Sequence, residues 1–311
     1  MKTKQLLIAS ALLLTTTFSV QAQEVKAIIN GVEQTFKVSQ LNNNGLNKAT
    51  AITVTGTWEA ADVVTLWASL AVRGNQESLK TADFSKAVLN SCNALFRNCT
   101  VLTTITLPET ENTNPVSFAT AFSGCLALTT VNNLDKFTNI TELGNTFLNC
   151  KSLTSITFAS GENNTSVDCT STFENCSSLT AINNFDKFTN TTLSLSFDNC
   201  TLLTELKLGS VSTVYPSFSG ITKEQGLKVY LPATATEIPA FWTDYIGTIE
   251  FILDPSVNIS NTEANAIPAI SYVYSIDGRL VKTVLAEDYN TLTNGLQQGI
   301  YIVNGKKVAV K

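Results

Sequence analysis

Seven cysteines are the residues of this 311-residue chain best suited to chemistry, because a thiolate can attack an electrophile, bind a metal or form a disulfide. The sequence contains no histidine. The usual general base for a cysteine or serine nucleophile is therefore missing, as is the commonest zinc ligand. No Cys-x-x-Cys pair, Walker-type glycine loop or dinucleotide fingerprint occurs either. These absences argue against nucleophilic, redox and zinc-dependent catalysis.

Five of the seven cysteines occupy one position of a repeated pattern, Phe-x-x-Cys-x-x-Leu-x-x-(Ile/Val/Leu). Successive copies of this cysteine are 26, 25, 26 and 24 residues apart. Such regularity is typical of a solenoid, in which each coil adds one layer to a shared core. The phenylalanines and cysteines of the pattern form what we call the core ladder: Phe96, Cys99, Phe122, Cys125, Phe147, Cys150, Phe173, Cys176, Phe197 and Cys200.

The cysteines of the core ladder are predicted to be buried thiols that pack as small hydrophobic groups. Stacked coils bring equivalent residues to roughly 5 Å, which is close enough for a disulfide. Parallel Cα–Cβ bonds nevertheless fit disulfide geometry badly. Cys92 and Cys169 lie outside the ladder, and we expect them to be free.

Carboxylates could support catalysis without histidine, as the paired acids of glycosidases do. The acids here occur singly in turns, such as Asp135, Asp186 and Asp198, which is typical of a solvated surface. Asn132–Asp135 recurs 51 residues later as Asn183–Asp186. Calcium is the alternative for these Asn-Asn-x-Asp turns, but one carboxylate per turn favours simple turn capping. We therefore predict no catalytic residue, no metal and no cofactor.

Each coil is expected to have two kinds of side. The Phe-x-x-Cys-x-x-Leu stretch has the spacing of a short helical or irregular turn that faces inward, and the alternation after it is strand-like. Residues flanking the buried strand residue should point outward, in a row of small hydroxyl and amide groups that becomes charged at its last rung. Partners dock on extended solenoid surfaces of this kind. The predicted partner-binding positions are Thr104, Thr106, Thr130, Asn132, Ser155, Thr157, Asn183, Glu205 and Lys207, with Ala181 in the same row.

The start of the chain has the features of a secretory signal. Lys2 and Lys4 precede the apolar stretch Leu6–Leu14, and Val20-Gln21-Ala22 resembles a cleavage site, so residues 1–22 are predicted to be removed. No later apolar run reaches 18 residues, so no transmembrane span is expected. Without Lys2 and Lys4, 18 basic residues face 25 acidic ones, a net charge of −7. Because no basic tract occurs, nucleic acid and anionic membranes are poor partners.

Residues 23–90 are predicted to form an N-terminal hairpin and capping unit. Asn30-Gly31 between two β-prone runs predicts a hairpin with a type I′ turn. A strand over Ala51–Thr55, a helix capped by Thr57 and running to about Val72, and a strand over Leu79–Phe84 should follow. This unit has the strand and helix of a coil without its Phe-x-x-Cys, as expected of a terminal cap.

The repeat array is expected over residues 91–253, with Ile221 in the place of the cysteine in a sixth unit. Residues 254–269 contain two prolines and no periodicity, which predicts a linker. Residues 270–311 alternate in polarity around Asp277-Gly278 and Asn304-Gly305 turns, which predicts a small C-terminal all-β module.

The repeats resemble the BspA-type leucine-rich repeat of bacterial surface proteins over about Leu95 to Leu231. The likeness implies an α/β-type solenoid, a right-handed leucine-rich-repeat array with short strands on one side. That family includes adhesins for host matrix proteins. The likeness therefore implies a non-catalytic binding or adhesion module that recognises an extracellular or host protein, with a glycan less favoured as ligand. A structural or self-assembling role in the envelope is the alternative.

The tail is similar to the C-terminal sorting domain of type IX secretion in Bacteroidota, in Tyr274-Ser275-Ile276-Asp277-Gly278-Arg279-Leu280 and in Gly295-Leu296-Gln297-Gln298-Gly299-Ile300-Tyr301. This likeness implies export across the outer membrane, to the cell surface or the medium. A periplasmic location is the alternative.

Overall fold

The computed structural model describes residues 23–41, 45–70, 77–232, 235, 238–252, 270–275, 280–285, 296–303 and 306–310. The signal sequence expected over residues 1–22 and the linker expected over 254–269 lie outside these ranges.

The N-terminal unit begins with the expected hairpin. Strands β1 (Glu24–Ile29) and β2 (Val32–Lys37) pair antiparallel. Asn30 and Gly31 between them have φ angles of 51° and 80°, and positive φ at both central positions defines the type I′ turn. A 3-10 turn, η1 (Val38–Gln40), follows β2.

A strand, a helix and a second strand complete this unit. Strand β3 (Ala49–Trp58) pairs antiparallel with β1 and parallel with β4 (Thr81–Leu89), and α1 (Ala60–Leu70) lies between β3 and β4 in the chain. The prediction that Thr57 caps the helix is wrong, because Thr57 belongs to β3. The Glu59 N–H instead donates to Asp62 Oδ2 at 2.9 Å, so a carboxylate in the first turn closes the helix start.

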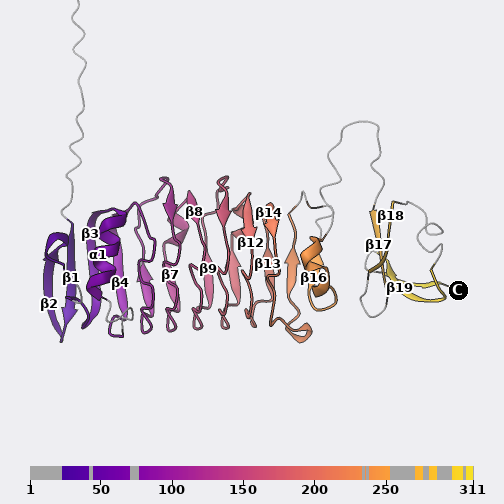
Figure 1. Ribbon diagram of the computed structural model, residues 1–311, viewed down its shortest axis with the longest axis horizontal. Coiled ribbons are helices and arrows are strands. Elements are labelled where there is room, and N and C mark those ends of the chain that lie inside the picture. The colour runs from indigo at the N-terminus through magenta and orange to yellow at the C-terminus, as the bar shows by residue number, and fades with distance from the viewer. Residues whose placement is uncertain are drawn as a thin grey trace, which may run out of the picture.

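The array beyond β4 carries one row of three-residue strands that run parallel, one strand in each coil (Figure 1). These strands are β5 (Thr104–Thr106), β7 (Thr130–Asn132), β9 (Ser155–Thr157), β11 (Ala181–Asn183), β13 (Glu205–Lys207), β15 (Lys228–Tyr230) and β16 (Glu250–Ile252). Equivalent residues pair in register, for example Ile105 with Val131 and Ile156 with Ile182. The middle residue points into the core, and its two neighbours point out. We call the outward side of this row the strand face.

A second row of strands corrects the expectation that strands lie on one side only. Strands β6 (Val116–Ser117), β8 (Ile140–Glu142), β10 (Val167–Asp168), β12 (Thr191–Leu193) and β14 (Val211–Val214) form a separate five-stranded parallel sheet. No α-helix occurs in the described coils, where the helical turns are the 3-10 turns η2 (Leu134–Lys136), η3 (Phe185–Lys187), η4 (Lys223–Gln225) and η5 (Ala240–Tyr245). The coils are therefore β-and-turn units, and not the α/β-type units expected. Strands of two to four residues are too short to show a period in the sequence.

The third side of each coil is a turn that contains the Phe-x-x-Cys pattern. Its alternate N–H groups donate to the next coil, as Ala94 does to Ala119 O at 2.9 Å and Phe96 does to Ala121 O at 2.7 Å. The N–H groups between them bond three residues back, as Cys99 does to Phe96 O at 3.0 Å. This alternation ties each turn to its neighbour and leaves no continuous helix.

The core is a stack of rings that continues from coil to coil. The ring planes of Phe122, Phe147 and Phe173 lie within 16° of parallel, with 5.5 Å between successive centroids. Phe84 meets the first ring of the stack edge-on at 5.7 Å, and Trp242 meets the ring of Phe218 at 5.0 Å in the same way. Large aromatic side chains thus close the core at both ends, where a stacked coil is missing.

The tail contains a four-stranded antiparallel sheet. Its strands are β17 (Ile270–Ser275), β18 (Leu280–Leu285), β19 (Gly299–Val303) and β20 (Lys306–Val310), in the order β18-β17-β19-β20. The expected turns at Asp277-Gly278 and Asn304-Gly305 lie outside the described residues.

Candidate partner-binding face

The core ladder lies inside the array, where it cannot meet a substrate. All ten of its side chains are fully buried, and all seven cysteines of the chain are free thiols. The Cys150 Sγ–H donates to Phe122 O at 3.2 Å, and Cys125, Cys176 and Cys200 donate to the equivalent carbonyl at 3.0 to 3.1 Å. Burial raises the pKa of Cys125 and of Cys200 to about 12, so neither is a nucleophilic thiolate near neutral pH. The ladder is a spine and not a reaction centre.

The asparagines before the ladder cysteines bond to one another. Asn175 Nδ2 donates to Asn149 Oδ1 at 3.0 Å, and Asn199 Nδ2 donates to Asn175 Oδ1 at 2.8 Å. Their φ angles of 59° to 63° lie in the left-handed region, which asparagine tolerates better than most residues do. Gly124 has the same conformation, and a Cβ there would come within 2.4 Å of Asn98 Oδ1.

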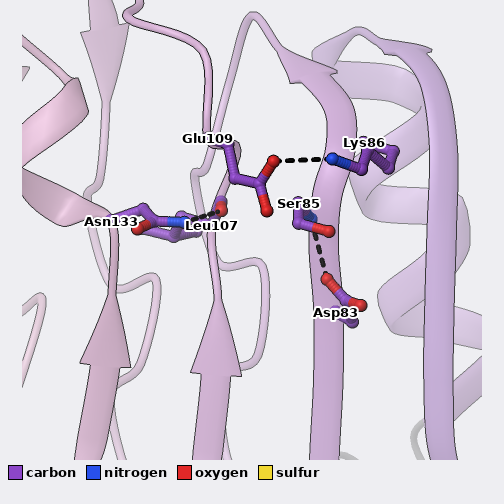
Figure 2. Close-up of polar contacts among 6 residues, drawn as sticks. All are labelled: Asp83, Ser85, Lys86, Leu107, Glu109 and Asn133. Atoms are coloured by element: carbon purple, nitrogen blue, oxygen red, sulfur yellow. Dashed lines mark hydrogen bonds and ion pairs between the residues drawn. The ribbon is translucent and has the colours of Figure 1, made fainter.

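The Asn-Asn-x-Asp turns are also held by contacts within the chain. Asn133 has a φ of 64°, and its Nδ2 donates to Leu107 O of the preceding coil at 2.9 Å (Figure 2). The Asp135 carboxylate pairs with Lys136 Nζ at 3.0 Å. Within the described ranges, no group of three or more Cys, Asp or Glu side chains is placed to hold a metal. Turn geometry and coil-to-coil bonding thus account for these residues.

The strand face brings the predicted partner-binding positions together in two columns. Thr104, Thr130, Ser155 and Glu205 line one column, and Thr106, Asn132, Thr157, Asn183 and Lys207 line the other. All of these side chains are exposed except those of Thr104 and Thr106, which are half-buried. The result is an exposed surface of hydroxyl and amide groups that becomes charged at Glu205 and Lys207.

Hydrogen bonds between coils hold many of these polar side chains in place. Asn183 Nδ2 donates to Thr157 Oγ1 at 3.0 Å, and Asn132 Nδ2 donates to Thr106 Oγ1 at 3.3 Å. Beside the columns, Thr129 Oγ1 donates to Thr103 O at 3.0 Å. A surface held in this way loses little side-chain entropy when a partner binds.

The row of strands is interrupted after β7, next to an Asn-Asn-x-Asp turn. Among the described strands, β7 and β9 belong to different sheets, as do β11 and β13. A hollow of about 270 Å³ lies at the first interruption, lined by Thr129, Asn132, Asp135, Ser155 and Thr157 among others. A second hollow, of about 370 Å³, shares Asp135 and Thr157 with it. The strand face is therefore indented at the first interruption, where polar side chains line the hollow.

A scan against protein families matches the BspA type leucine rich repeat region, in six copies, over residues 74–143 and 118–244. These matches span residues 74–244, which is 171 of the 311 residues and more than half of the chain. The chain belongs to the BspA-type leucine-rich repeat family. No curated protein and no solved structure matches it.

Membership in the BspA-type family limits the functions that the strand face can serve. Repeats of this family generally bind partners, above all proteins, and do not catalyse reactions. The match also covers more of the chain than Leu95 to Leu231, where the sequence resembles this family, since it includes β4 at one end and most of η5 at the other. Among the described residues of this BspA-type protein, no helix is long and apolar enough to cross a membrane.

The strand face becomes charged and gains an aromatic ring at its C-terminal end. Glu205 Oε1 lies 3.3 Å from Lys207 Nζ, and Lys228 Nζ lies 3.8 Å from Glu250 Oε2. Lys207 Nζ also lies 5.7 Å from the centre of the Tyr230 ring. At the other end, Lys86 Nζ lies 2.6 Å from Glu109 Oε2 (Figure 2). Charged rungs thus border the neutral middle of the face.

Two features of the spine were not predicted from the sequence. Cys92 and Cys169 share one repeat position with Phe118 and Leu143, since the N–H of each donates to the equivalent carbonyl of the next coil. Their side chains are buried, but the row is hard to recognise in the sequence because the position holds cysteine, phenylalanine or leucine. Buried hydroxyls form another row, in which Thr172 Oγ1 donates to Leu143 O at 2.9 Å. Hydroxyls four residues before a ladder cysteine are a weak signal, because Leu or Ala also occurs there.

Proposed function

We propose that this BspA-type protein is a secreted or cell-surface module that binds an extracellular protein through its strand face and catalyses no reaction. The observation that supports this proposal is the exposed row of paired strands, in which amide groups of one coil donate to hydroxyl groups of the neighbouring coil. Such a surface can hydrogen-bond a partner with little loss of entropy. We also propose that the array coils in a right-handed sense.

Tyr230 and the charged groups around it are the part of the strand face best suited to anchor a partner. Aromatic residues dominate the energetics of most protein interfaces. The Tyr230 ring is half-buried beside Lys207, and Lys228 and Glu250 are exposed in the neighbouring column. The neutral hydroxyl rows would then supply complementarity and hydrogen bonds.

Charge substitutions on the face test this proposal. The double variant Thr130→Lys, Ser155→Lys places two cations beside the hollow, and we expect at least tenfold weaker capture of the protein that binds best in a panel of purified extracellular matrix and plasma proteins. Ser177→Lys, at an exposed site on the turn side, is the matched control and should bind as the wild type does. Unchanged capture by the double variant would move the binding site away from the strand face. A panel of glycans distinguishes a saccharide ligand.

We also propose that residues 1–22 direct export and that the tail acts as a type IX sorting domain of a Bacteroidota protein. The support is the sequence likeness described above, together with the antiparallel strands in that region. Deletion of Ile270–Lys311 should leave the protein in the periplasm, as measured by immunoblots of cell fractions. Normal surface display of the truncated chain would show that the tail is not needed for sorting.

A structural, self-assembling role is the second candidate function. The observation that favours it is an open sheet edge at the N-terminal end of the array, where β2 is the outermost strand (Figure 1).

A further inference from the structure

The outer edge of strand β2 is suited to pairing with another strand. Among the described strands, β2 pairs with β1 alone and ends the six-stranded sheet. Five of its six residues are exposed, and Val32 is 60% exposed. An edge strand presents a row of N–H and C=O groups that another chain can pair with, so natural proteins usually cover or interrupt it.

The hairpin geometry shows which backbone groups face outward. In a hairpin with a two-residue turn, the residues flanking the turn exchange both hydrogen bonds, and alternate residues beyond them do the same. Val32, which pairs with Ile29, therefore faces β1, whereas Glu33, Thr35 and Lys37 face outward. The Lys37 N–H agrees with this direction, since it donates to Gln40 Oε1 at 2.8 Å and not to β1, and Gln40 must release it before Lys37 can pair with another strand.

The charges on this edge favour one antiparallel register between two copies. If Thr35 lies opposite the same residue of the second copy, Glu33 lies opposite Lys37 at both ends of the pairing. Opposite charges directly across an antiparallel pair stabilise it, and like charges destabilise it. Registers centred on Glu33 or Lys37 would oppose like charges and pair fewer residues. The register centred on Thr35 therefore pairs the most residues and is also the one that the charges favour.

A strand that merely protects its edge from association would carry a charge pattern that repels a second copy. Here the two charges have opposite sign and stand four residues apart, so the edge complements itself. Within the hairpin, Glu33 is held by Lys26, whose Nζ lies 3.6 Å away. In the pairing centred on Thr35, Lys37 of the second copy would lie on the other side of Glu33 from Lys26.

We propose that two copies of this chain associate through β2, pairing antiparallel about Thr35. The two-fold axis would stand perpendicular to the sheet, because opposite residues of an antiparallel pair point to the same face. The two six-stranded sheets would join into one, and both strand faces would lie on the same side. A dimer would then present two binding faces together and gain avidity for a multivalent partner.

Exchange of charges tests the dimer directly. Wild-type protein should show twice the mass of a single mature chain by sedimentation at high concentration. Glu33→Lys and Lys37→Glu, each alone, should weaken self-association by roughly tenfold or more, because attraction becomes repulsion at both ends. An equal mixture of the two variants should form the heterodimer. Lys86→Glu, a charge reversal on β4 and away from the β2 edge, is the control and should leave the mass unchanged. A monomeric wild type, or a mixture that stays monomeric, would overturn the proposal.

Cross-linking tests the register separately. Two residues opposite each other in a hydrogen-bonded antiparallel pair have Cα atoms about 5.5 Å apart, within disulfide range. Thr35→Cys should therefore give a covalent dimer on mild oxidation, and Ser155→Cys, far along the array, should not. The native thiols are all buried and add no background. Equal cross-linking of the two variants would show that β2 does not pair about Thr35.

Discussion

At the scale of single residues, this protein uses reactive side-chain types for packing. A cysteine fits the core ladder because it is small and apolar enough to stack, and its thiol adds a second, weak hydrogen bond to a carbonyl that already accepts from a backbone N–H. Burial raises the pKa of each ladder thiol, and for Cys125 and Cys200 the value reaches about 12. Cysteine here supplies a weak hydrogen bond and not a nucleophile.

The left-handed asparagines permit a test of which property of the residue matters. Asn175→Gly and Asn175→Ala both remove the amide bonds to Asn149 and Asn199, but only alanine is strained at a φ of 63°. We expect the free energy of unfolding of the alanine variant to be about 1 kcal/mol lower than that of the glycine variant, measured by urea denaturation. At Ser177, where φ is not positive, we expect the glycine variant to be less stable than the alanine variant. Equal stabilities at Asn175 would contradict the left-handed account.

At the scale of elements, the sequence predicted the main strands well, because β5, β7, β9 and β13 each have one apolar residue between two polar ones, six residues after a ladder cysteine. Ile105 and Ile156 lie inside, and Thr130 and Thr157 lie outside, as their alternation indicates. The hairpin followed from Asn30-Gly31, a pair of residues that readily adopts positive φ. The preferences of single residues were therefore sufficient to predict these elements.

The second row of strands could not be predicted in this way. Val116–Ser117 and Val167–Asp168 are too short to show a period, and their conformation is set by pairing with the neighbouring coils. Thr57 failed as a helix cap for a related reason, since pairing with Val88 extended β3 through that residue. Contacts between coils override local preference at these positions.

The candidate site was predicted in part. The outward residues of the strand face followed from alternation, but the hollow beside β7 depends on the interruption of the sheet, which no single coil's sequence contains. The Asn132–Asp135 insertion marks the position, and its repetition at Asn183–Asp186 marks the second interruption. The recurring insertion therefore indicates where the row of strands is interrupted.

At the scale of the whole molecule, the contacts that hold the coils together and the proposed recognition surface lie on different sides of each coil. The core ladder and the asparagine row hold the coils together inside and on the turn side, and the strand face lies outside with its side chains already held in place. A solenoid can change its displayed residues without disturbing the stacking. The central claim is that a partner meets the strand face and leaves the turn side exposed.

Thiol footprinting tests that claim most directly, because the native thiols are buried and the wild-type protein should not be labelled. Single cysteines placed at Thr157 on the strand face and at Ser177 on the turn side would be labelled with a maleimide, with and without the protein captured from the panel. The account predicts that the bound protein slows labelling of Thr157→Cys at least severalfold and leaves Ser177→Cys unchanged. Protection of Ser177→Cys, with Thr157→Cys labelled at its free rate, would contradict it.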